Sequence, residues 1–252
     1  MIGPFAVLAA LLGLVIGSFV NVVVARLPAG RSLWGPHSAC LACGTPIAWH
    51  DNIPLLSFAL LRGRCRTCGV AISPRYPIIE AMTGGLFVLA YATLGLDSDL
   101  VIAFLLLPAL VAITAIDLEH QIVPDKITLP GIVAGVIANV ACQRVPWVDS
   151  IIGIVVGGGV FLVIILASGG GMGGGDMKLG AMLGAFLGWK IALLSILVAV
   201  IVGGAVAVAF LASGTKGRKE PIAFGPFLAG GGVVGLLWGE RVITWYMSAF
   251  RV

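Results

Sequence analysis

Two aspartates of the 252-residue chain lie where apolar segments meet polar ones. Asp117 ends one apolar run, and Asp176 follows a glycine-rich stretch and precedes another apolar run. Ionisable side chains at membrane depth are costly and are usually functional. Two carboxylates at one depth can share a proton, so that one takes a proton from water while the other donates to a carbonyl oxygen. The pattern therefore indicates aspartyl proteolysis, with Asp117 and Asp176 as the catalytic pair.

Each acidic residue also has a plain structural interpretation when it is taken alone. Asp176 could be the N-cap of the helix that follows it, because aspartate favours that position. Asp117 could be a carboxylate at the interfacial end of a helix. Asp125 is interpreted as a cap of the next helix. Glu80 is predicted to be either a salt-bridge partner of Arg75 or a functional group, and the sequence does not separate the two.

Four of the five cysteines form two Cys-x-x-Cys pairs, Cys40 with Cys43 and Cys65 with Cys68. Each pair can present two sulfurs to one ion from a tight turn, and two pairs complete a tetrahedral site. We predict a structural zinc ion here, which would fold a loop too small to build its own core. Two disulfides are the alternative, which a reducing cytosol disfavours. Thiol redox chemistry fits two matched pairs poorly.

The composition indicates the medium in which these groups act. Hydrophobic residues make up 60% of the chain and charged residues 10%, against roughly 25% charged in soluble domains. A bilayer core solvates apolar side chains directly, and one span needs about 20 residues. Apolar runs lie at about 4–25, 77–96, 99–116, 127–143, 150–168, 177–189, 191–212 and 222–248. The predicted fold is an all-α polytopic membrane protein with about eight transmembrane helices.

The polar stretch between the first two runs is the only one large enough for a small extramembrane domain. We therefore divide the chain into a first transmembrane helix (1–25), a zinc-binding loop domain (26–76) and a transmembrane aspartyl protease core (77–252). If this loop is cytoplasmic and the runs alternate, eleven of the fifteen Lys and Arg residues lie inside, as the positive-inside rule requires. Asp117 and Asp176 then lie at the cytoplasmic edge. A net charge of only +4 indicates no nucleic-acid partner.

Several longer motifs accompany these residues. They include Asp117 with Ile122-Val-Pro-Asp125, then Gly173-Gly-Gly-Asp-Met-Lys-Leu179, and finally Phe224-Gly-Pro-Phe-Leu-Ala-Gly230. Together with the two cysteine pairs, they make the chain resemble the bacterial type IV prepilin peptidases. That family consists of GxGD-type intramembrane aspartyl proteases, many of which are both leader peptidases and N-methyltransferases. The resemblance extends over most of the chain.

The resemblance implies a function, a location and a set of site residues. It implies leader cleavage of type IV prepilins and type II secretion pseudopilins in the bacterial inner membrane, at the cytoplasmic face. By family position Asp117 and Asp176 are the protease pair, and the four cysteines of the loop are zinc ligands. It also implies S-adenosylmethionine as the donor for methylation of the new N-terminus. The sequence holds no glycine-rich fingerprint for that donor, so its binding residues are not assigned.

Two other classes of protein remain as alternatives at this point. A transporter or channel with a zinc-stabilised loop would use membrane carboxylates as ion relays, although such proteins often contain internal repeats, and the two halves of this chain show no convincing repeat. A scaffold that binds pilins without cutting them is the other alternative. An assay with a purified prepilin would separate these two classes from a protease.

Overall fold

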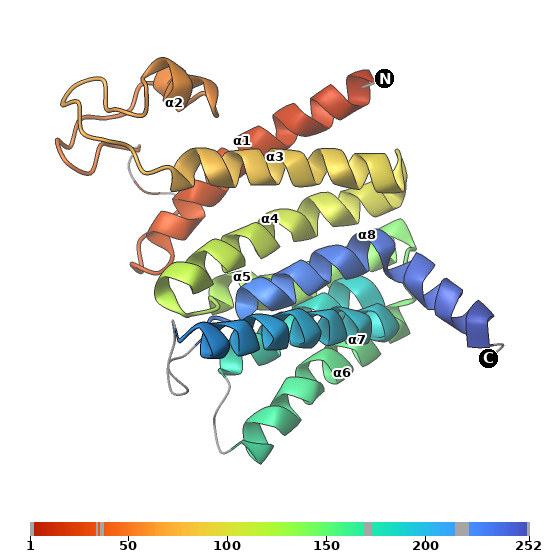
Figure 1. Ribbon diagram of the computed structural model, residues 1–252. Coiled ribbons are helices and arrows are strands. Elements are labelled where there is room, and N and C mark those ends of the chain that lie inside the picture. Colours follow the sequence, from red (N-terminus) through yellow and green to blue (C-terminus); the bar gives the residue numbers. More distant parts are fainter. Residues whose placement is uncertain (1–2, 34, 36–37, 169–172, 215–221, 251–252) are drawn as a thin grey trace. The chain divides into compact units, whose positions relative to one another are not determined.

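The computed structural model describes residues 3–33, 35, 38–168, 173–214 and 222–250. These residues form helices joined by turns, with two isolated bridges and no longer strand in the described part. The helices are α1 (Pro4–Arg26), η1 (Trp49–Asn52), α2 (Leu56–Leu60), α3 (Arg75–Leu94), α4 (Ser98–His120), α5 (Asp125–Cys142), α6 (Trp147–Ala167), α7 (Gly174–Ser213) and α8 (Gly225–Phe250) (Figure 1). The all-α prediction is confirmed.

Within the described residues, six helices are long and apolar enough to cross a membrane by length and composition: α1, α3, α4, α5, α6 and α7. The sixth and seventh apolar runs of the sequence both lie in α7, which is 40 residues long. Non-helical angles at Gly188 (φ 75°, ψ 167°) divide α7 into two halves. The eighth run forms α8. Residues 169–172 of the glycine stretch and 215–219 of the basic loop lie outside the described residues.

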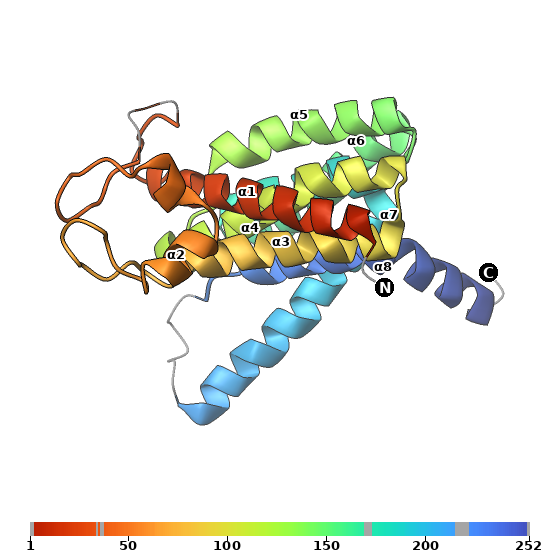
Figure 2. The same ribbon diagram turned by 90° about the horizontal axis from the view of Figure 1, so that it is seen from above.

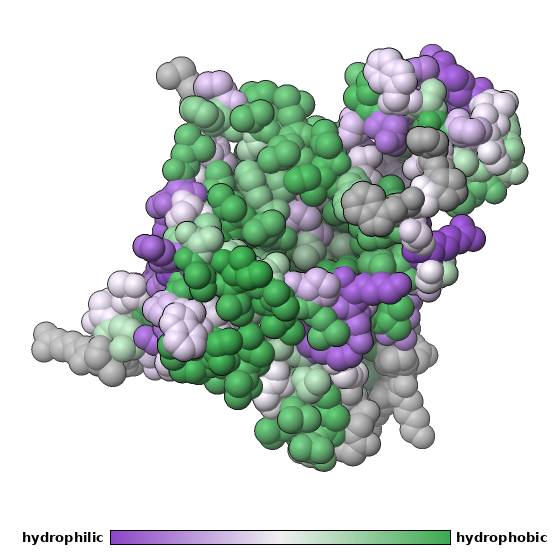
Figure 3. Space-filling view, turned by 180° about the vertical axis from the view of Figure 1, so that it is seen from behind, coloured by the Kyte–Doolittle hydropathy of each residue, from purple (hydrophilic) through white to green (hydrophobic). Residues whose placement is uncertain are grey.

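The surface of the helices is apolar over a large area. Leu8, Val155 and Leu166 are 61%, 68% and 74% exposed, and many other large apolar side chains are exposed with them. Figure 3 shows such side chains covering much of one face. Monomeric soluble proteins rarely expose contiguous apolar surface of this extent, whereas lipid tails solvate it. The protein is therefore a multi-pass membrane protein.

The chain forms two compact units, residues 1–95 and 96–252. In the first unit, α1 and α3 lie side by side (Figures 1 and 2). Two glycines of α1 allow this approach, because a Cβ on Gly13 would lie 2.7 Å from the Cα of Gly84, and one on Gly17 would lie 2.8 Å from the Cα of Glu80. The cysteine-bearing loop connects these two helices.

In the second unit, glycines bring α6 and α7 into backbone contact. Gly153 and Gly157 of α6 face Gly184 and Gly180 of α7, and a Cβ on any of the four would clash with the opposite backbone. Small residues four positions apart permit this type of close packing between membrane helices. The contact fixes the first half of α7, whose N-terminal turn carries Asp176.

The break at Gly188 has a compensating contact from α5. A helix interrupted inside a membrane leaves carbonyl groups without helical donors, and neighbouring side chains must satisfy them. Asn139 does so, because its buried side-chain amide donates to the carbonyl oxygens of Ala185 (2.8 Å) and Phe186 (3.0 Å). The same amide donates to the hydroxyl of Ser150 in α6 at 3.0 Å. One side chain therefore joins α5, α6 and the first half of α7.

Substituting Gly157 by alanine tests the α6–α7 contact. The new methyl group would press on the carbonyl of Gly180, and overpacking of this kind costs about 1–3 kcal/mol. We expect Gly157→Ala to lower the midpoint of thermal unfolding in detergent. Gly159→Ala is the matched control, because a Cβ at Gly159 has nothing within 4 Å. Equal midpoints for the two variants would contradict the proposed packing.

Candidate active site and metal centre

Asp117 lies in the last turn of α4 and is only 5% exposed. Its Oδ2 accepts a hydrogen bond of 2.9 Å from the backbone N–H of Gly225, the first residue of α8. A Cβ on Gly225 would lie 2.7 Å from that same oxygen, so this close approach depends on glycine. Asp117 is therefore a buried carboxylate held by the start of another helix rather than a solvated group at a helix end.

Asp176 lies in the first turn of α7, which begins at Gly174. The N-cap of α7 is Gly173, and no side chain caps the helix by a hydrogen bond. The interpretation of Asp176 as an N-cap is therefore not what the structure shows, because Asp176 follows the capping position by three residues. Its half-buried carboxylate has no hydrogen-bond partner among the described residues, and it is free to face the space beside the helix.

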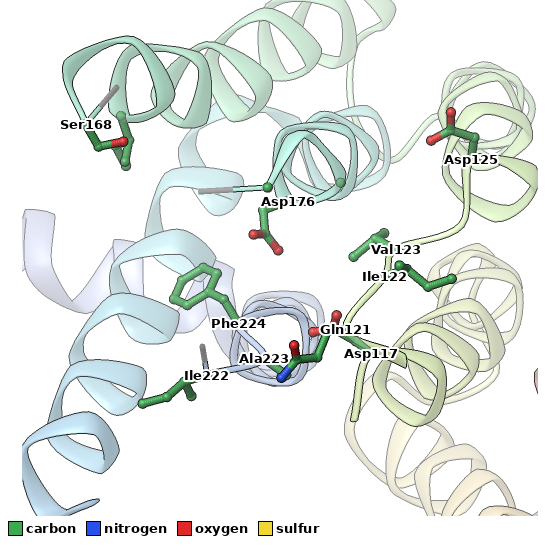
Figure 4. Close-up of a pocket in the computed structure, with 13 residues that line it drawn as sticks. Asp117, Gln121, Ile122, Val123, Asp125, Ser168, Asp176, Ile222, Ala223 and Phe224 are labelled. Carbon is green, nitrogen blue, oxygen red and sulfur yellow. The ribbon is translucent and has the colours of Figure 1, made fainter. Parts of the chain in front are cut away.

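Both aspartates line one cavity of about 630 Å³. Figure 4 shows the two carboxylates directed into this space from α4 and α7. The ends of all five helices of the second unit, or the segments next to them, contribute to its wall, and the described lining residues are Asp117, Gln121, Ile122, Val123, Asp125, Ile164, Ser168, Gly173, Gly175, Asp176, Ile222, Ala223 and Phe224. A cavity of this size accommodates a short stretch of extended peptide next to both carboxylates.

The third carboxylate of the cavity has a different partner. Both oxygens of Asp125 accept hydrogen bonds from the Nζ of Lys178, at 2.6 and 2.7 Å. Asp125 is the first residue of α5 and caps nothing, because the N-cap is Pro124 and no capping hydrogen bond forms. In Figure 4, Asp125 stands apart from Asp117 and Asp176. The ion pair joins the start of α5 to the start of α7, next to Asp176.

The four paired cysteines meet in the loop of the first unit. The sulfurs of Cys40, Cys43, Cys65 and Cys68 all lie within 4.8 Å of one another, and those of Cys40 and Cys68 are 3.8 Å apart. Tetrahedral coordination with bonds of about 2.3 Å places sulfurs about 3.8 Å apart. The four sulfurs therefore fit a single metal ion such as zinc.

The two cysteine turns have the same backbone structure. In the first, Cys40 N–H donates to Thr45 and Gly44 N–H donates back to Cys40; in the second, Cys65 N–H donates to Val70 and Gly69 N–H donates back to Cys65. Both glycines have a positive φ, 71° and 70°, which glycine adopts without steric cost. The glycine after each pair is thus part of the turn that presents the two sulfurs.

Polar contacts inside the loop support these turns. Arg66, between the second pair of cysteines, donates to both oxygens of Asp51 at 2.8 and 2.6 Å. This hydrogen-bonded guanidinium holds the pKa of Asp51 below its usual range. A hydrogen bond with the Thr45 hydroxyl lowers the pKa of Cys43 to about 6. A lower pKa favours the thiolate at Cys43, which is the form that binds metals, whereas desolvation and the neighbouring cysteines raise the pKa of Cys68 to about 11.

Glu80 of α3 contacts the same loop. It is 8% exposed, and its Oε2 accepts a hydrogen bond of 2.8 Å from the backbone N–H of Leu55. Leu55 has φ 58° and ψ −45°, and Leu56 N–H donates to Pro54 at 2.6 Å across it. This is a γ-turn of the rare, strained type with a positive φ. Glu80 therefore attaches a strained turn of the loop to α3.

The sequence singled out two aspartates that line one cavity and four cysteines whose sulfurs meet, but it missed several of their partners. Gly225-Pro226 at the start of an apolar run was a usable signal, because proline is common in the first turn of a helix. It did not indicate which side chain that helix end would meet. The ion pair between Asp125 and Lys178 spans 53 positions, and no local pattern indicates it. Asp99 pairs with the buried side chain of Arg144 at 3.3 Å, a contact that the sequence did not indicate either.

Comparisons with known proteins place the chain in a family. A model described as the bacterial peptidase A24 N-terminal domain matches residues 11–94, and one described as the type IV leader peptidase family matches residues 104–208. The chain is 37% identical over 271 residues to a prepilin leader peptidase/N-methyltransferase of Aeromonas salmonicida, covering 94% of this chain and 92% of the relative. The chain is also similar to two relatives with the same name. The one from Stutzerimonas stutzeri is 36% identical, and the match covers 98% of this chain and 96% of the relative. The one from Klebsiella pneumoniae is 45% identical, and the match covers 71% of this chain and 83% of the relative. No solved structure matches the chain.

Replacing Glu80 tests its contact with the loop. In Glu80→Ala the N–H of Leu55 loses its acceptor, which costs about 1–3 kcal/mol when the group stays buried. We expect faster cleavage of the loop around residues 53–61 in limited proteolysis. Glu80→Gln keeps an acceptor oxygen and should be much closer to the original protein, and Glu240→Ala, in the exposed part of α8, is the control. An unchanged rate in Glu80→Ala would show that the contact does not hold the loop.

Proposed function

The chain belongs to the type IV leader peptidase family, and on that basis we propose that it cleaves the leader peptides of type IV prepilins and type II secretion pseudopilins. The observation that carries the proposal is the pair Asp117 and Asp176, which line one cavity from two helices. The activity is that of an aspartic endopeptidase of the bacterial inner membrane. The positive-inside rule supports a position of the cavity at the cytoplasmic face.

The two aspartates divide the work of hydrolysis. One carboxylate is ionised and takes a proton from water while the water oxygen bonds to the scissile carbonyl carbon. The other is protonated and gives its proton to the carbonyl oxygen, so a neutral tetrahedral diol forms. In the second half, the C–N bond breaks, the first aspartate gives its proton to the leaving amine, and the second recovers a proton from the diol. The pair holds one proton before and after the reaction, as closely spaced carboxylates favour.

The wall of the cavity supports entry from the lipid side. Ile164 and Ser168 line the cavity at the end of α6. Ile164 is itself 36% exposed, and Val163 next to it is 65% exposed. The cavity wall is therefore continuous with a surface that faces lipid tails. A substrate that is an apolar helix with a polar leader could pack along this surface and present its boundary to the aspartates.

The loop domain (26–76), which connects the first transmembrane helix (1–25) to the protease core (77–252), is a structural zinc domain in this proposal. Cys40, Cys43, Cys65 and Cys68 are the ligands, and four sulfurs leave no open position for chemistry at the metal. The names of the relatives also include N-methyltransferase, so we propose that the enzyme methylates the new N-terminus. S-adenosylmethionine would supply the methyl group. The partners are the prepilins and the surrounding lipid bilayer.

Asparagine substitutions test the assignment of the aspartates. Asp117→Asn and Asp176→Asn each remove a proton-transfer group and should lower cleavage of a purified prepilin by a factor of at least ~10³, within the range for loss of an essential catalytic group. Asp125→Asn is the matched control, because it changes a carboxylate of the same cavity that is paired with Lys178. We expect it to stay within about tenfold of the original rate. A gel-shift assay measures all three, and normal processing by either of the first two would refute the pair.

Substitution of a cysteine tests the metal centre. Cys40→Ser removes one of four sulfurs, so the purified variant should contain much less than one zinc per chain by elemental analysis. Cys142→Ser is the control, because Cys142 ends α5 and lies outside the cluster. It should keep the zinc content of the original protein. One zinc per chain in Cys40→Ser would contradict a site made of four sulfurs.

A further inference from the structure

The start of α8 offers a single backbone donor to the cavity. A helix leaves the N–H groups of its first turn without helical partners. In α8, Pro226 has no N–H, and the N–H groups of Phe227 and Leu228 donate to the carbonyl of Phe224. The N–H of Gly225 is the one that remains, and it donates to Oδ2 of Asp117 at 2.9 Å. Asp117 therefore caps α8 although it belongs to α4.

This contact makes the two aspartates unequal. Hydrogen bonds from a fixed donor stabilise a carboxylate more than a carboxylic acid. Asp117 has such a donor, whereas Asp176 has no hydrogen-bond partner among the described residues. Each of the two also lies at the N-terminal end of a helix, α8 for Asp117 and α7 for Asp176, so the helix dipoles favour negative charge at both. By exposed area Asp117 is the more buried of the two, which disfavours its charge. The fixed hydrogen bond acts against this effect of burial, and it is the contact that Asp176 does not have.

From this difference we propose that Asp117 is the ionised aspartate that activates water, that Asp176 is the protonated aspartate that donates to the carbonyl oxygen, and that Gly225 is the positioning residue that fixes these roles. The assignment rests on the proposed proteolytic function. Oδ2 of Asp117 is engaged by Gly225, so Oδ1 receives the proton of water. Asp176 gives its proton to the carbonyl oxygen, and the tetrahedral diol forms as described above.

Other charged groups near Asp117 do not alter this comparison. From α7 the facing group is Asp176 itself, and from α5 it is Asp125, which Lys178 neutralises. The lining residues from α6, Ile164 and Ser168, do not titrate, and the first titratable residue of α8 is Glu240. On α4, the exposed titratable residues Glu119 and His120 follow Asp117, and their side chains lie 3.9 Å from each other. Within the described residues, the donor from Gly225 is thus specific to Asp117.

The dependence of the cleavage rate on pH tests the assignment, measured with the purified full chain in detergent and a synthetic prepilin peptide. Gly225→Ala places a methyl group against Oδ2 of Asp117 and disrupts the hydrogen bond. If Asp117 is the ionised partner, the acidic limb of the profile moves to higher pH by about one unit or more, as expected for the loss of a hydrogen bond to a charged group. The alkaline limb stays in place. A shift of the alkaline limb alone, or of neither limb, would overturn the assignment.

Two further variants, a control in α8 and a backbone ester at position 225, separate the loss of the hydrogen bond from other effects of the Gly225→Ala substitution. Gly230→Ala is the matched control in α8, because a Cβ at Gly230 has nothing within 4 Å, and both limbs should be unchanged. Glycolic acid at position 225, introduced by cell-free synthesis, replaces the N–H by an ester oxygen and adds no side chain. It should shift the acidic limb in the same direction even if Gly225→Ala does not fold. Cleavage by these proteins at their optimum pH would leave the proteolytic function intact whichever limb moves.

Discussion

The hydrogen bond between Gly225 and Asp117 is the contact on which the arrangement of the site depends. A buried carboxylate needs donors, and in an apolar medium water supplies few of them. The N-terminal end of α8 supplies one at 2.9 Å, and in return Asp117 satisfies an N–H that α8 itself cannot use. The contact joins α4 to α8, so the same hydrogen bond positions the carboxylate of Asp117 and holds these two helices together.

Close contact between helix backbones holds α6 and α7 of the second unit together. Lipid tails solvate apolar side chains as well as a protein core does, so helices associate through packing and hydrogen bonds. The glycines shared by α6 and α7 provide the packing, and Asn139 provides the hydrogen bonds at the break in α7. Together they fix the first half of α7, which carries Asp176. The absence of a side chain at Gly225 likewise permits a close approach, in this case by the carboxylate of Asp117.

The sequence was sufficient to predict the parts of the fold and site that depend on local patterns. The apolar runs predicted the helices, and the two Cys-x-x-Cys pairs predicted the tight turns that bring the four sulfurs together. Partners that are distant in the chain were not predictable, since Gly225 follows Asp117 by 108 positions. Asp125 illustrates the same limit, because its position at a helix start suggested a cap, while its partner is a lysine on another helix. The sequence separated two apolar runs at position 190, close to the break in α7 at Gly188, but no local pattern reveals that Asn139 of α5 contacts this break.

The central claim is that Asp117 and Asp176 act together on one peptide bond. It is tested most directly by a structure of the enzyme with a prepilin peptide that carries a hydroxyl group in place of the scissile carbonyl. The account predicts that one oxygen of each carboxylate lies within about 3 Å of that hydroxyl, with Gly225 still bonded to Asp117. An inhibitor bound in the cavity with its hydroxyl in contact with only one aspartate would contradict the account.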